Sequence, residues 1–300
     1  MGGGGGYRGY TSTQRQTSPS MSGSQASEQE IEINKFLEEL LKDINSRDAE
    51  AINKHLEEIQ KVLSNEIKGL EKILFGGSIA KNTFIEGTSD VDALVFLDET
   101  KYRNTSPKEL QNAFYDMLRQ RFPRSDISKG KLAVTIRFSD YEIQLLPAIK
   151  KGDKVCIADR GTTKWTEPID TKAFTSKLTR MNQVNNNKLI PVIKISKALL
   201  SNLPDEYKLS GYHIEAMAVD IFRSYNGRFT LFDMTRHFLI NAQKSVLTPT
   251  RDITGQSGIV DDYLGIPGSI ERQKVARQIK VITEKFSGSD AVSVTKALFD

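Results

Sequence analysis

The sequence GGSIAKNTFIEGTSDVDALVFL, residues 76–97, decides the fold, because a glycine-rich turn is followed there by an apolar segment with the composition of a β-strand. The two glycines allow the backbone to approach a ligand closely. The residues after Gly77 predict a short helix, whose free N–H groups and Ser78 hydroxyl can receive a phosphate. Lys81 follows one turn later and can add a positive charge. This stretch therefore predicts a phosphate-binding turn next to a strand.

Two acidic residues open the predicted strand at residues 90–97. Asp90 and Asp92 project to the same face, because alternate residues of a strand share a face. Their Cβ atoms would be roughly 6–7 Å apart, so the two carboxylates can hold a hard divalent cation, Mg²⁺ or Mn²⁺. Two acids with this spacing can also be solvated side chains on an edge strand. The metal-binding interpretation is favoured, because acids inside an otherwise apolar strand need a partner.

The composition excludes several classes of protein. Cys156 is the only cysteine, which excludes a disulfide framework and a cysteine metal cluster. The histidines at 55, 213 and 237 lack the spacing of zinc ligands, so oxygen atoms have to hold any catalytic metal. The formal charge of +4, from 42 basic and 38 acidic residues, permits nucleotide binding, but stable nucleic-acid binding is not expected. No apolar run approaches the ~18 residues of a membrane span, so we expect a cytoplasmic protein without membrane contact.

The chain divides into three parts by composition and periodicity. Residues 1–27 are rich in glycine and serine and predict a disordered tail. Residues 28–165 predict a core of strands with N-terminal helices, and residues 166–300 predict a helical part. Helices are predicted at 28–45, 48–67, 107–122, 191–202, 210–225, 231–247 and 269–285. Strands are predicted at 72–75, 90–97, 132–138 and 141–145, the last two forming a hairpin whose pairing Pro147 ends.

The Gly-Gly-Ser turn followed by Asp-x-Asp resembles the active-site signature of the nucleotidyltransferase superfamily with the DNA-polymerase-β fold. The resemblance implies an α+β fold with two lobes, in which a polymerase-β-like nucleotidyltransferase lobe with a mixed β-sheet stands before a helical lobe. It also implies that Asp90 and Asp92 are catalytic and bind Mg²⁺, and that Gly77, Ser78 and Lys81 contact the nucleotide.

The third acid of this superfamily normally stands three residues before a proline on a later strand. Here the matching segment is YEIQLLPA, residues 141–148, and Gln144 occupies the place of the acid. Glutamine cannot deprotonate a hydroxyl and is a weak metal ligand. Glu142 shares a strand face with Gln144 and can supply the missing charge, or it is an exposed glutamate of the hairpin.

Two segments of the helical part resemble the phosphate-binding residues of oligoadenylate-synthase-like and archaeal CCA-adding members of the superfamily. Lys194 and Lys197 lie three residues apart on one helix face, and Ser210 opens the next helix. The resemblance implies that Lys197 and Ser210, with Lys194 in reserve, hold the β- and γ-phosphates, and that Tyr212 stacks on a base. Read locally, the lysines also fit a solvated helix face, and Ser210 fits a helix cap.

The segments DITGQS at 252–257 and VDDYLG at 260–265 resemble the late region of bacterial cyclic-oligonucleotide synthases, the cyclic GMP-AMP-synthase/DncV-like nucleotidyltransferase (CD-NTase) family. His213 and Glu215 are expected to support the fold, and Asp261 and Asp262 are expected to form a turn and a helix cap rather than to be catalytic. Trp165 either stacks on a base or belongs to the hinge between the lobes.

Membership of this family implies a Mg²⁺-dependent enzyme that joins nucleoside triphosphates, ATP among them, into a cyclic di- or trinucleotide with release of pyrophosphate. It further implies a place in anti-phage (CBASS-type) signalling, with regulatory or effector proteins as partners. Two other functions stay open. The chain can be a CCA-adding-like enzyme that extends an oligonucleotide, or a nucleotide-binding pseudoenzyme, because Gln144 replaces the third acid.

Overall fold

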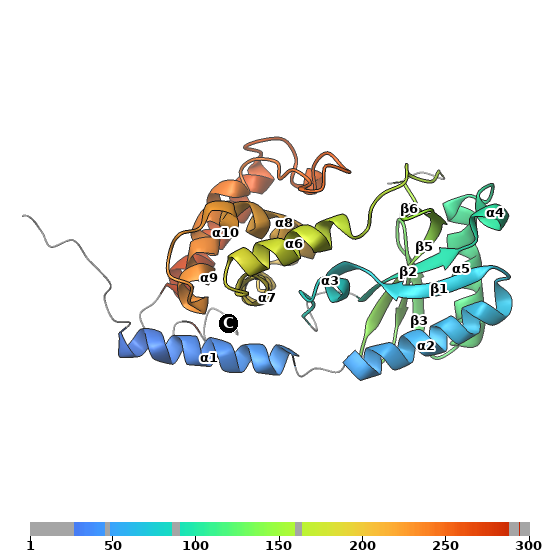
Figure 1. Ribbon diagram of the computed structural model, residues 1–300, viewed down its shortest axis with the longest axis horizontal. Coiled ribbons are helices and arrows are strands. Elements are labelled where there is room, and N and C mark those ends of the chain that lie inside the picture. The colour runs from blue at the N-terminus through green and yellow to red at the C-terminus, as the bar shows by residue number, and fades with distance from the viewer. Residues whose placement is uncertain (1–26, 46–48, 86–90, 160–163, 288–293, 295–300) are drawn as a thin grey trace, which may run out of the picture.

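The structure, a computed structural model, describes residues 27–45, 49–85, 91–159, 164–287 and 294. A part built around a β-sheet, the sheet lobe, lies beside a part built of helices, the helical lobe (Figure 1). Each lobe has its own hydrophobic core. This arrangement agrees with the predicted α+β fold of a sheet lobe followed by a helical lobe. The predicted tail at residues 1–27 lies outside the described residues except for Ser27.

The described residues of the sheet lobe contain one mixed sheet with the strand order β1-β2-β5-β4-β3, in which β6 also pairs with β5. Its strands are β1 (Leu70–Phe75), β2 (Val91–Leu97), β3 (Asp126–Lys129), β4 (Val134–Arg137), β5 (Glu142–Lys151) and β6 (Lys154–Ile157). The central strands β2 and β5 run parallel, whereas the other pairs are antiparallel. The sheet is therefore mixed, as predicted.

Helices α2 (Ala49–Glu66) and α5 (Pro107–Arg121) pack on one face of the sheet. The apolar residues of β2 and β5 that point to this face are completely buried, and the core also contains Phe114 of α5. α5 begins after Ser106 because the Ser106 side chain and Glu109 form a reciprocal capping box and Pro107 occupies the first turn. The opposite face of β2 and β5 carries the polar residues discussed below.

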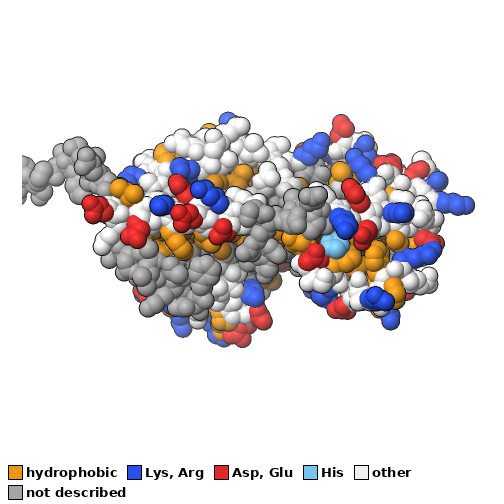
Figure 2. All heavy atoms as spheres, turned by 90° about the horizontal axis from the view of Figure 1, so that it is seen from below, with side chains coloured by type: hydrophobic (Ala, Val, Ile, Leu, Met, Phe, Trp, Pro, Cys, Tyr) orange, Lys and Arg blue, Asp and Glu red, His pale blue; other side chains and the backbone are white. Residues whose placement is uncertain are grey.

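The helical lobe contains α6 (Ala173–Val184), α7 (Leu189–Leu200), α8 (Gly211–Ile221), α9 (Leu231–Ser245) and α10 (Ile270–Phe286). Short 3₁₀ turns lie at Asp205–Tyr207, Phe222–Ser224 and Asp262–Leu264. None of the helices among the described residues has the length and apolar character needed to cross a lipid bilayer. On the face shown in Figure 2, basic and acidic side chains are interspersed.

Helix α1 (Glu28–Asn45) lies alongside the helical lobe, although its position in the sequence assigned it to the sheet lobe (Figure 1). Its buried residues Ile33, Leu37 and Leu41 belong to the core of the helical lobe. The repeat of apolar residues shows that α1 has a buried face, but it cannot show which core receives that face. The domain boundaries at 27/28 and 165/166 stay a prediction.

Four short or weakly apolar elements were absent from the sequence prediction: α4 (Glu99–Tyr102), α6, β3 and β6. In β3 only Ile127 is buried, so the strand has no alternating pattern to reveal it. The predicted end of the hairpin pairing before Pro147 is confirmed, but the strand itself is longer than predicted. Pairing with β4 does end at Leu145, but β5 continues through Pro147 to Lys151 along β2 and β6. Proline is tolerated there because no β4 residue pairs with it.

Candidate active site

The glycine turn is built directly onto the carboxylate of Asp92. The N–H of Gly76 donates to the Asp92 carbonyl oxygen over 2.8 Å. Gly77 has φ +48°, and a Cβ added to it would lie 1.8 Å from Oδ2 of Asp92. Only glycine fits there, because any other side chain would be strained and would displace the carboxylate. Gly77 and the buried Ser78 open helix α3 (Gly77–Ala80), so the predicted phosphate-binding turn touches the predicted catalytic acid.

Gln144 lies beside Asp92 on the neighbouring strand. The parallel register of β2 and β5 pairs Asp92 with Gln144, and both side chains are partly exposed on the face opposite the core. The structure thus puts Gln144 at the place where the resemblance expects the third acid. Asp90, the other predicted metal ligand, lies outside the described residues.

Glu142 forms an ion pair with Arg137, its register partner on β4. Arg137 Nε donates to Glu142 Oε2 over 2.7 Å, and Arg137 Nη2 donates to Oε1 over 3.2 Å. Arg137 also donates to Asp126 of β3 over 2.9 Å. These contacts favour the interpretation of Glu142 as a hairpin glutamate over its use as a substitute for the third acid.

The oxygen donors of this face suit a hard cation such as Mg²⁺. The Asp92 carboxylate and the Gln144 amide oxygen belong to adjacent residues of two strands, and oxygen ligands are those that Mg²⁺ prefers. Within the described residues no group of three His, Cys, Asp or Glu side chains forms a metal site. The assignment of Asp90 and Asp92 as metal ligands therefore stays a prediction, and the donors that the structure describes are compatible with it.

Four polar residues join the two lobes, all of them buried except Lys81, which is partly buried. We call them the junction cluster: Lys81, Thr83, Lys197 and Glu215. Lys197 Nζ of α7 lies 2.8 Å from Oε1 of Glu215, and it donates to the carbonyl oxygen of Thr83 over 3.0 Å. Lys81 Nζ and the Thr83 hydroxyl also donate to the Glu215 carboxylate. The side chains of Lys197 and Glu215 are only 3% and 1% exposed. The segment after α3 is thereby bound to α7 and α8.

The junction cluster contains two ammonium groups but a single carboxylate. Burial by itself would raise the pKa of Glu215, but Lys197 and Lys81 outweigh burial and hold this pKa below its usual value. Burial lowers the pKa of Lys197, whereas the charges of Glu215 and Asp92 oppose that change. The field of Asp92 thus reaches Lys197. Among its own four members the cluster has one positive charge in excess, and Asp92 beside the glycine turn offsets part of it.

Lys81 is further enclosed by two aromatic rings. Its Nζ lies 4.9 Å from the centroid of Phe174 and 5.1 Å from that of Tyr212, both within the range of a cation–π contact. The Tyr212 ring packs against Phe174, and its hydroxyl donates to Asp252 over 2.9 Å. Burial and the hydrogen bond to Asp252 raise the pKa of Tyr212. The role of Tyr212 as a base-stacking residue stays a prediction, because here its ring contacts protein groups.

Ser210 and Lys194 occupy different surroundings. Ser210 is exposed and caps α8, since its Oγ accepts the N–H of His213 over 3.2 Å. Lys194 donates to Asn45 and lines a hollow of about 260 Å³ with Ile79 and Asn82. Burial and the charge of Lys197 lower the pKa of Lys194. The phosphate-binding roles of Lys197 and Ser210 stay a prediction, since the Lys197 side chain is 3% exposed and its ammonium group contacts Glu215 and Thr83. Lys194 lines a separate hollow.

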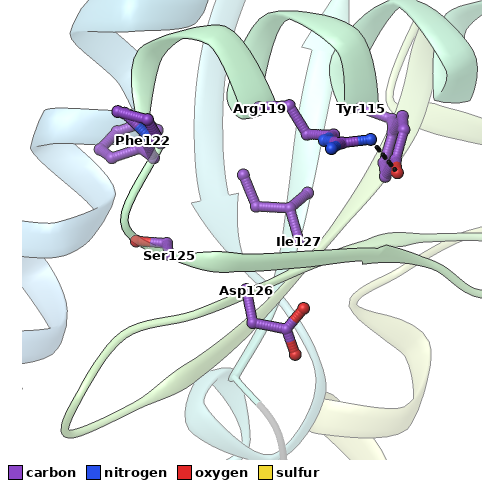
Figure 3. A pocket seen from close by; sticks show the side chains of 7 residues that line it. Tyr115, Arg119, Phe122, Ser125, Asp126 and Ile127 are labelled. Atoms are coloured by element: carbon purple, nitrogen blue, oxygen red, sulfur yellow. Dashed lines mark hydrogen bonds between the residues drawn. The ribbon is translucent and has the colours of Figure 1, made fainter.

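Another hollow, of about 440 Å³, lies between α5 and β3 (Figure 3). It is lined by Tyr115, Arg119, Phe122, Pro123, Ser125, Asp126 and Ile127. None of the predicted site residues lines it, and Arg119 donates to the Tyr115 hydroxyl over 3.0 Å (Figure 3). Trp165 is partly buried, packs against the sheet-lobe core and donates to the carbonyl oxygen of Thr105 over 3.0 Å.

The sequence did not predict that Glu215 and Thr83 bind the lysines of the candidate site. Glu215 was expected to support the fold, and Thr83 had no assigned role. The signal that points to Glu215 is a glutamate among apolar residues of α8, since a buried carboxylate needs cationic partners. Its partners come from segments more than 130 residues earlier, at Lys81 and Thr83, so local spacing cannot identify them.

Comparison with known protein families gives one match along the chain. The Second Messenger Oligonucleotide or Dinucleotide Synthetase (SMODS) domain matches residues 31–182, just over half of the chain. Among curated proteins, no sequence matches at a significant level.

Solved structures with the same fold are numerous. The CdnE cyclic dinucleotide synthase of Elizabethkingia meningoseptica with GTP and Apcpp has 14% identity and a TM-score of 0.58, covering 75% of this chain and 89% of its own. CdnC of E. coli MS115-1 with ATP has the same identity and TM-score, covering 86% and 92%. The apo form of Vibrio cholerae DncV has 14% identity and a TM-score of 0.59, covering 90% and 83%. At this identity the similarity shows the fold alone, and it confirms the predicted polymerase-β-like fold class.

Proposed function

Because the chain belongs to the family of Second Messenger Oligonucleotide or Dinucleotide Synthetase domains, which are nucleotidyltransferases, we propose that it joins nucleoside triphosphates into a cyclic di- or trinucleotide and releases pyrophosphate. One observation supports this proposal most directly. The Asp92 carboxylate lies against Gly77 and beside Gln144, and its charge reaches Lys197 of the helical lobe. Asp92, which would bind the metal, and Lys197, which would bind phosphate, are thus close enough to interact at the junction of the lobes.

We propose that the triphosphate is held between the lobes. Gly77 and Ser78 would receive phosphate oxygens from the sheet lobe, and Lys197 and Ser210 would do so from the helical lobe. The excess positive charge of the junction cluster, to which Lys81 contributes, supports this orientation of an anionic ligand. Lys194 would act on the triphosphate through its charge from a greater distance, because it lines the separate hollow beside α3.

We propose that Asp90 and Asp92 hold Mg²⁺, with Mn²⁺ as a substitute. When bound, the metal would supply charge neutralisation at the reacting phosphate and at the departing pyrophosphate. Asp92 is positioned for this role by the glycine turn that packs against its carboxylate. In the reaction, a ribose hydroxyl attacks the α-phosphorus, and the bond from that phosphorus to the pyrophosphate oxygen breaks. Gln144 can orient groups by hydrogen bonding, but it cannot accept the hydroxyl proton, which has to leave to another acceptor.

The test is to incubate the protein with all four nucleoside triphosphates and Mg²⁺ or Mn²⁺ and to identify the products by mass spectrometry. We expect a cyclic oligonucleotide and an equivalent release of pyrophosphate. Asp92→Asn should abolish both, whereas Asp153→Asn should leave them unchanged, because Asp153 is an exposed aspartate in the turn between β5 and β6. Triphosphate consumption without a cyclic product would contradict the proposal, as would equal activity of Asp92→Asn.

Gln144 favours a second candidate, a nucleotide-binding pseudoenzyme. A pseudoenzyme would be stabilised against heat by a nucleoside triphosphate but would release no pyrophosphate. Gln144→Asp distinguishes the cases, because it restores the third acid beside Asp92. A large gain of activity would mean that the native site lacks a needed group, whereas a loss would mean that glutamine belongs to the working geometry.

We propose that the product serves as a second messenger in cytoplasmic anti-phage (CBASS-type) signalling and that other proteins regulate the enzyme or respond to its product. CdnC of E. coli MS115-1 has also been solved in a complex with HORMA, which supports a search for a regulatory protein partner here. Purification of the tagged protein from its native host, followed by identification of co-purifying proteins, tests this part of the proposal.

A further inference from the structure

The VDDYLG segment, residues 260–265, packs against the start of α8 rather than standing apart as a surface turn. Asp261 is completely buried, and the Tyr263 hydroxyl contacts the first residues of α8. We propose that Tyr263 is a positioning residue, which holds Ser210 at the place where Ser210 binds the triphosphate. This inference rests on the proposed function, because it assigns the triphosphate as the ligand of Ser210.

The Tyr263 hydroxyl bridges two groups at the start of α8. It accepts the backbone N–H of Ser210 over 3.0 Å, and it lies 3.0 Å from Nδ1 of His213. His213 in turn donates its own backbone N–H to Oγ of Ser210. Ser210 therefore makes two contacts, one from its backbone nitrogen to Tyr263 and one from its hydroxyl to the backbone of His213. Tyr263 in turn contacts the His213 ring.

The His213 ring is completely buried and keeps a defined orientation. Its Nε2 lies 3.0 Å from the Thr250 hydroxyl and 3.3 Å from Oδ2 of Asp261. Burial lowers the pKa of His213 to about 4, so the ring is neutral at physiological pH. With the Nε2–H directed to the Asp261 carboxylate, Nδ1 accepts a hydrogen bond from the Tyr263 hydroxyl. The Tyr263 oxygen then has a lone pair directed to the Ser210 N–H.

Arg272 of α10 anchors the far end of this chain of contacts. The side chain is completely buried, and its Nη1 donates to Oδ2 of Asp261 over 2.8 Å. Nη1 also donates to the carbonyl oxygens of Val246 and Thr248, whereas Nη2 donates to that of Asp261 and Nε to that of Gly265. The second carboxylate oxygen of Asp261 accepts the N–H of Thr250 over 2.9 Å. A buried polar network with its partners satisfied is rigid, so it can fix the Tyr263 hydroxyl in space.

Tyr263 is 48% exposed, and its hydroxyl contacts Ser210 and His213. The residue therefore contributes little to the core, and the hydroxyl provides the specific contact. We name the set Ser210, His213, Asp261, Tyr263 and Arg272 the anchor network. Tyr263→Phe removes the bridge to Ser210 and leaves the ion pair of Asp261 with Arg272 in place.

The experiment is a double-mutant cycle between Tyr263 and Ser210. Binding of ATP in the presence of Mg²⁺ is measured by calorimetry, and KM and kcat are measured for cyclic product formation. Tyr263→Phe should weaken ATP binding and raise KM by roughly three- to tenfold, the effect of one hydrogen bond, with a smaller change in kcat. In a Ser210→Ala background the same substitution should change binding less than about twofold, because Tyr263 acts through Ser210.

Tyr225→Phe is the matched control. The Tyr225 hydroxyl also donates to protein, at the carbonyl oxygen of Arg228 over 2.6 Å, but it has no contact with Ser210. This variant should bind ATP as the wild type does. Hydrogen exchange supplies a second measurement: Tyr263→Phe should speed exchange of the Ser210 amide, and Tyr225→Phe should not.

The outcomes separate this inference from the proposed function. If Ser210→Ala weakens ATP binding while Tyr263→Phe binds like the wild type, or if the two effects add fully, the role of Tyr263 is wrong and the triphosphate site stands. If the wild type binds no triphosphate, or if Ser210→Ala has no effect on binding, the site itself is wrong and the inference falls with it.

Discussion

The two buried charged networks of the molecule differ in their balance of charge. In the anchor network, Arg272 faces the single carboxylate of Asp261, and the remaining guanidinium donors reach backbone carbonyl oxygens. In the junction cluster, the ammonium groups of Lys81 and Lys197 share the single carboxylate of Glu215. A balanced buried pair is complete without a ligand, whereas an excess cation is better satisfied when an anion arrives. The contrast indicates that the ion pair of Arg272 with Asp261 is structural, and it supports the proposal that the junction cluster binds phosphate.

The largest expected effect is on stability, from Arg272→Met. The substitution leaves the Asp261 carboxylate buried without its cation, which should cost about 3–5 kcal/mol of unfolding free energy. Urea unfolding measures it, and the exposed Arg277→Met should change stability little. If added inorganic triphosphate restored the stability of Arg272→Met, the distinction between the two networks would fail.

Glu215→Gln should destabilise the protein by about 1–3 kcal/mol, because it keeps the shape of the side chain but removes the carboxylate that pairs with the ammonium groups of Lys81 and Lys197. Unlike Arg272→Met, this variant should regain part of its stability when inorganic triphosphate is added, since the anion can replace the lost charge. The measurement is the melting temperature against triphosphate concentration. Glu271→Gln, on an exposed residue of α10, is the control. An equal response of both variants to triphosphate would contradict the role of the junction cluster.

Lys197→Met should lower the affinity for ATP while changing the free energy of unfolding little. The substitution leaves Lys81 paired with Glu215, so the buried charges become balanced and unfolding free energy should change by about 1 kcal/mol or less. The excess charge is lost, so ATP affinity should fall roughly tenfold, the equivalent of one charge-assisted hydrogen bond. Calorimetric titration with ATP and Mg²⁺ checks this, with the exposed Lys280→Met as control. A large loss of stability with unchanged affinity would reverse the assignment of Lys197.

The smallest expected effect is a pH dependence of stability that arises in the anchor network. Burial lowers the pKa of His213 from 6.5 to about 4, so the unfolded chain binds a proton more readily than the folded protein between these values. Stability from the neutral ring is therefore complete above pH 6.5 and declines as the pH falls towards 4. Urea unfolding at pH 7 and pH 5.5 should differ by roughly 1 kcal/mol. His213→Asn should flatten this difference, leaving the smaller contribution of His237, whose pKa burial also lowers. An unchanged pH dependence in His213→Asn would show that the ring is not the titrating group.

Much of the fold could be predicted from local pattern. The repeat of apolar residues located α1 at 28–45 and placed α9 and α10 close to their observed bounds. The hairpin of β4 and β5 was predicted from its turn at Ser139-Asp140. The elements that escaped prediction, such as β3 with Ile127 as its single buried residue, have too few apolar side chains to show a period.

In the candidate site too, some residues could be predicted from local spacing and others could not. Gly77 and Asp92 were predicted from their spacing, because a tight turn before a strand is a local property, and the parallel register then put Gln144 beside Asp92. Glu142 could not be assigned from the sequence, because its partner Arg137 became evident only with the pairing of β4 and β5. The same holds for Tyr263, whose hydroxyl meets Ser210 across a separation of 53 residues.

Local order in this chain follows from steric limits and from the period of apolar residues, which act over a few positions and can be read directly from the amino acids. They establish the glycine turn, the acidic strand and the amphipathic helices. The choice of partners depends on which surfaces meet after the chain has collapsed, because ion pairs and hydrogen bonds act through space rather than along the chain. Only the tertiary structure therefore determines that α1 packs on the helical lobe. The same is true of the ion pairs of Lys81 and Lys197 with Glu215 and of Arg272 with Asp261.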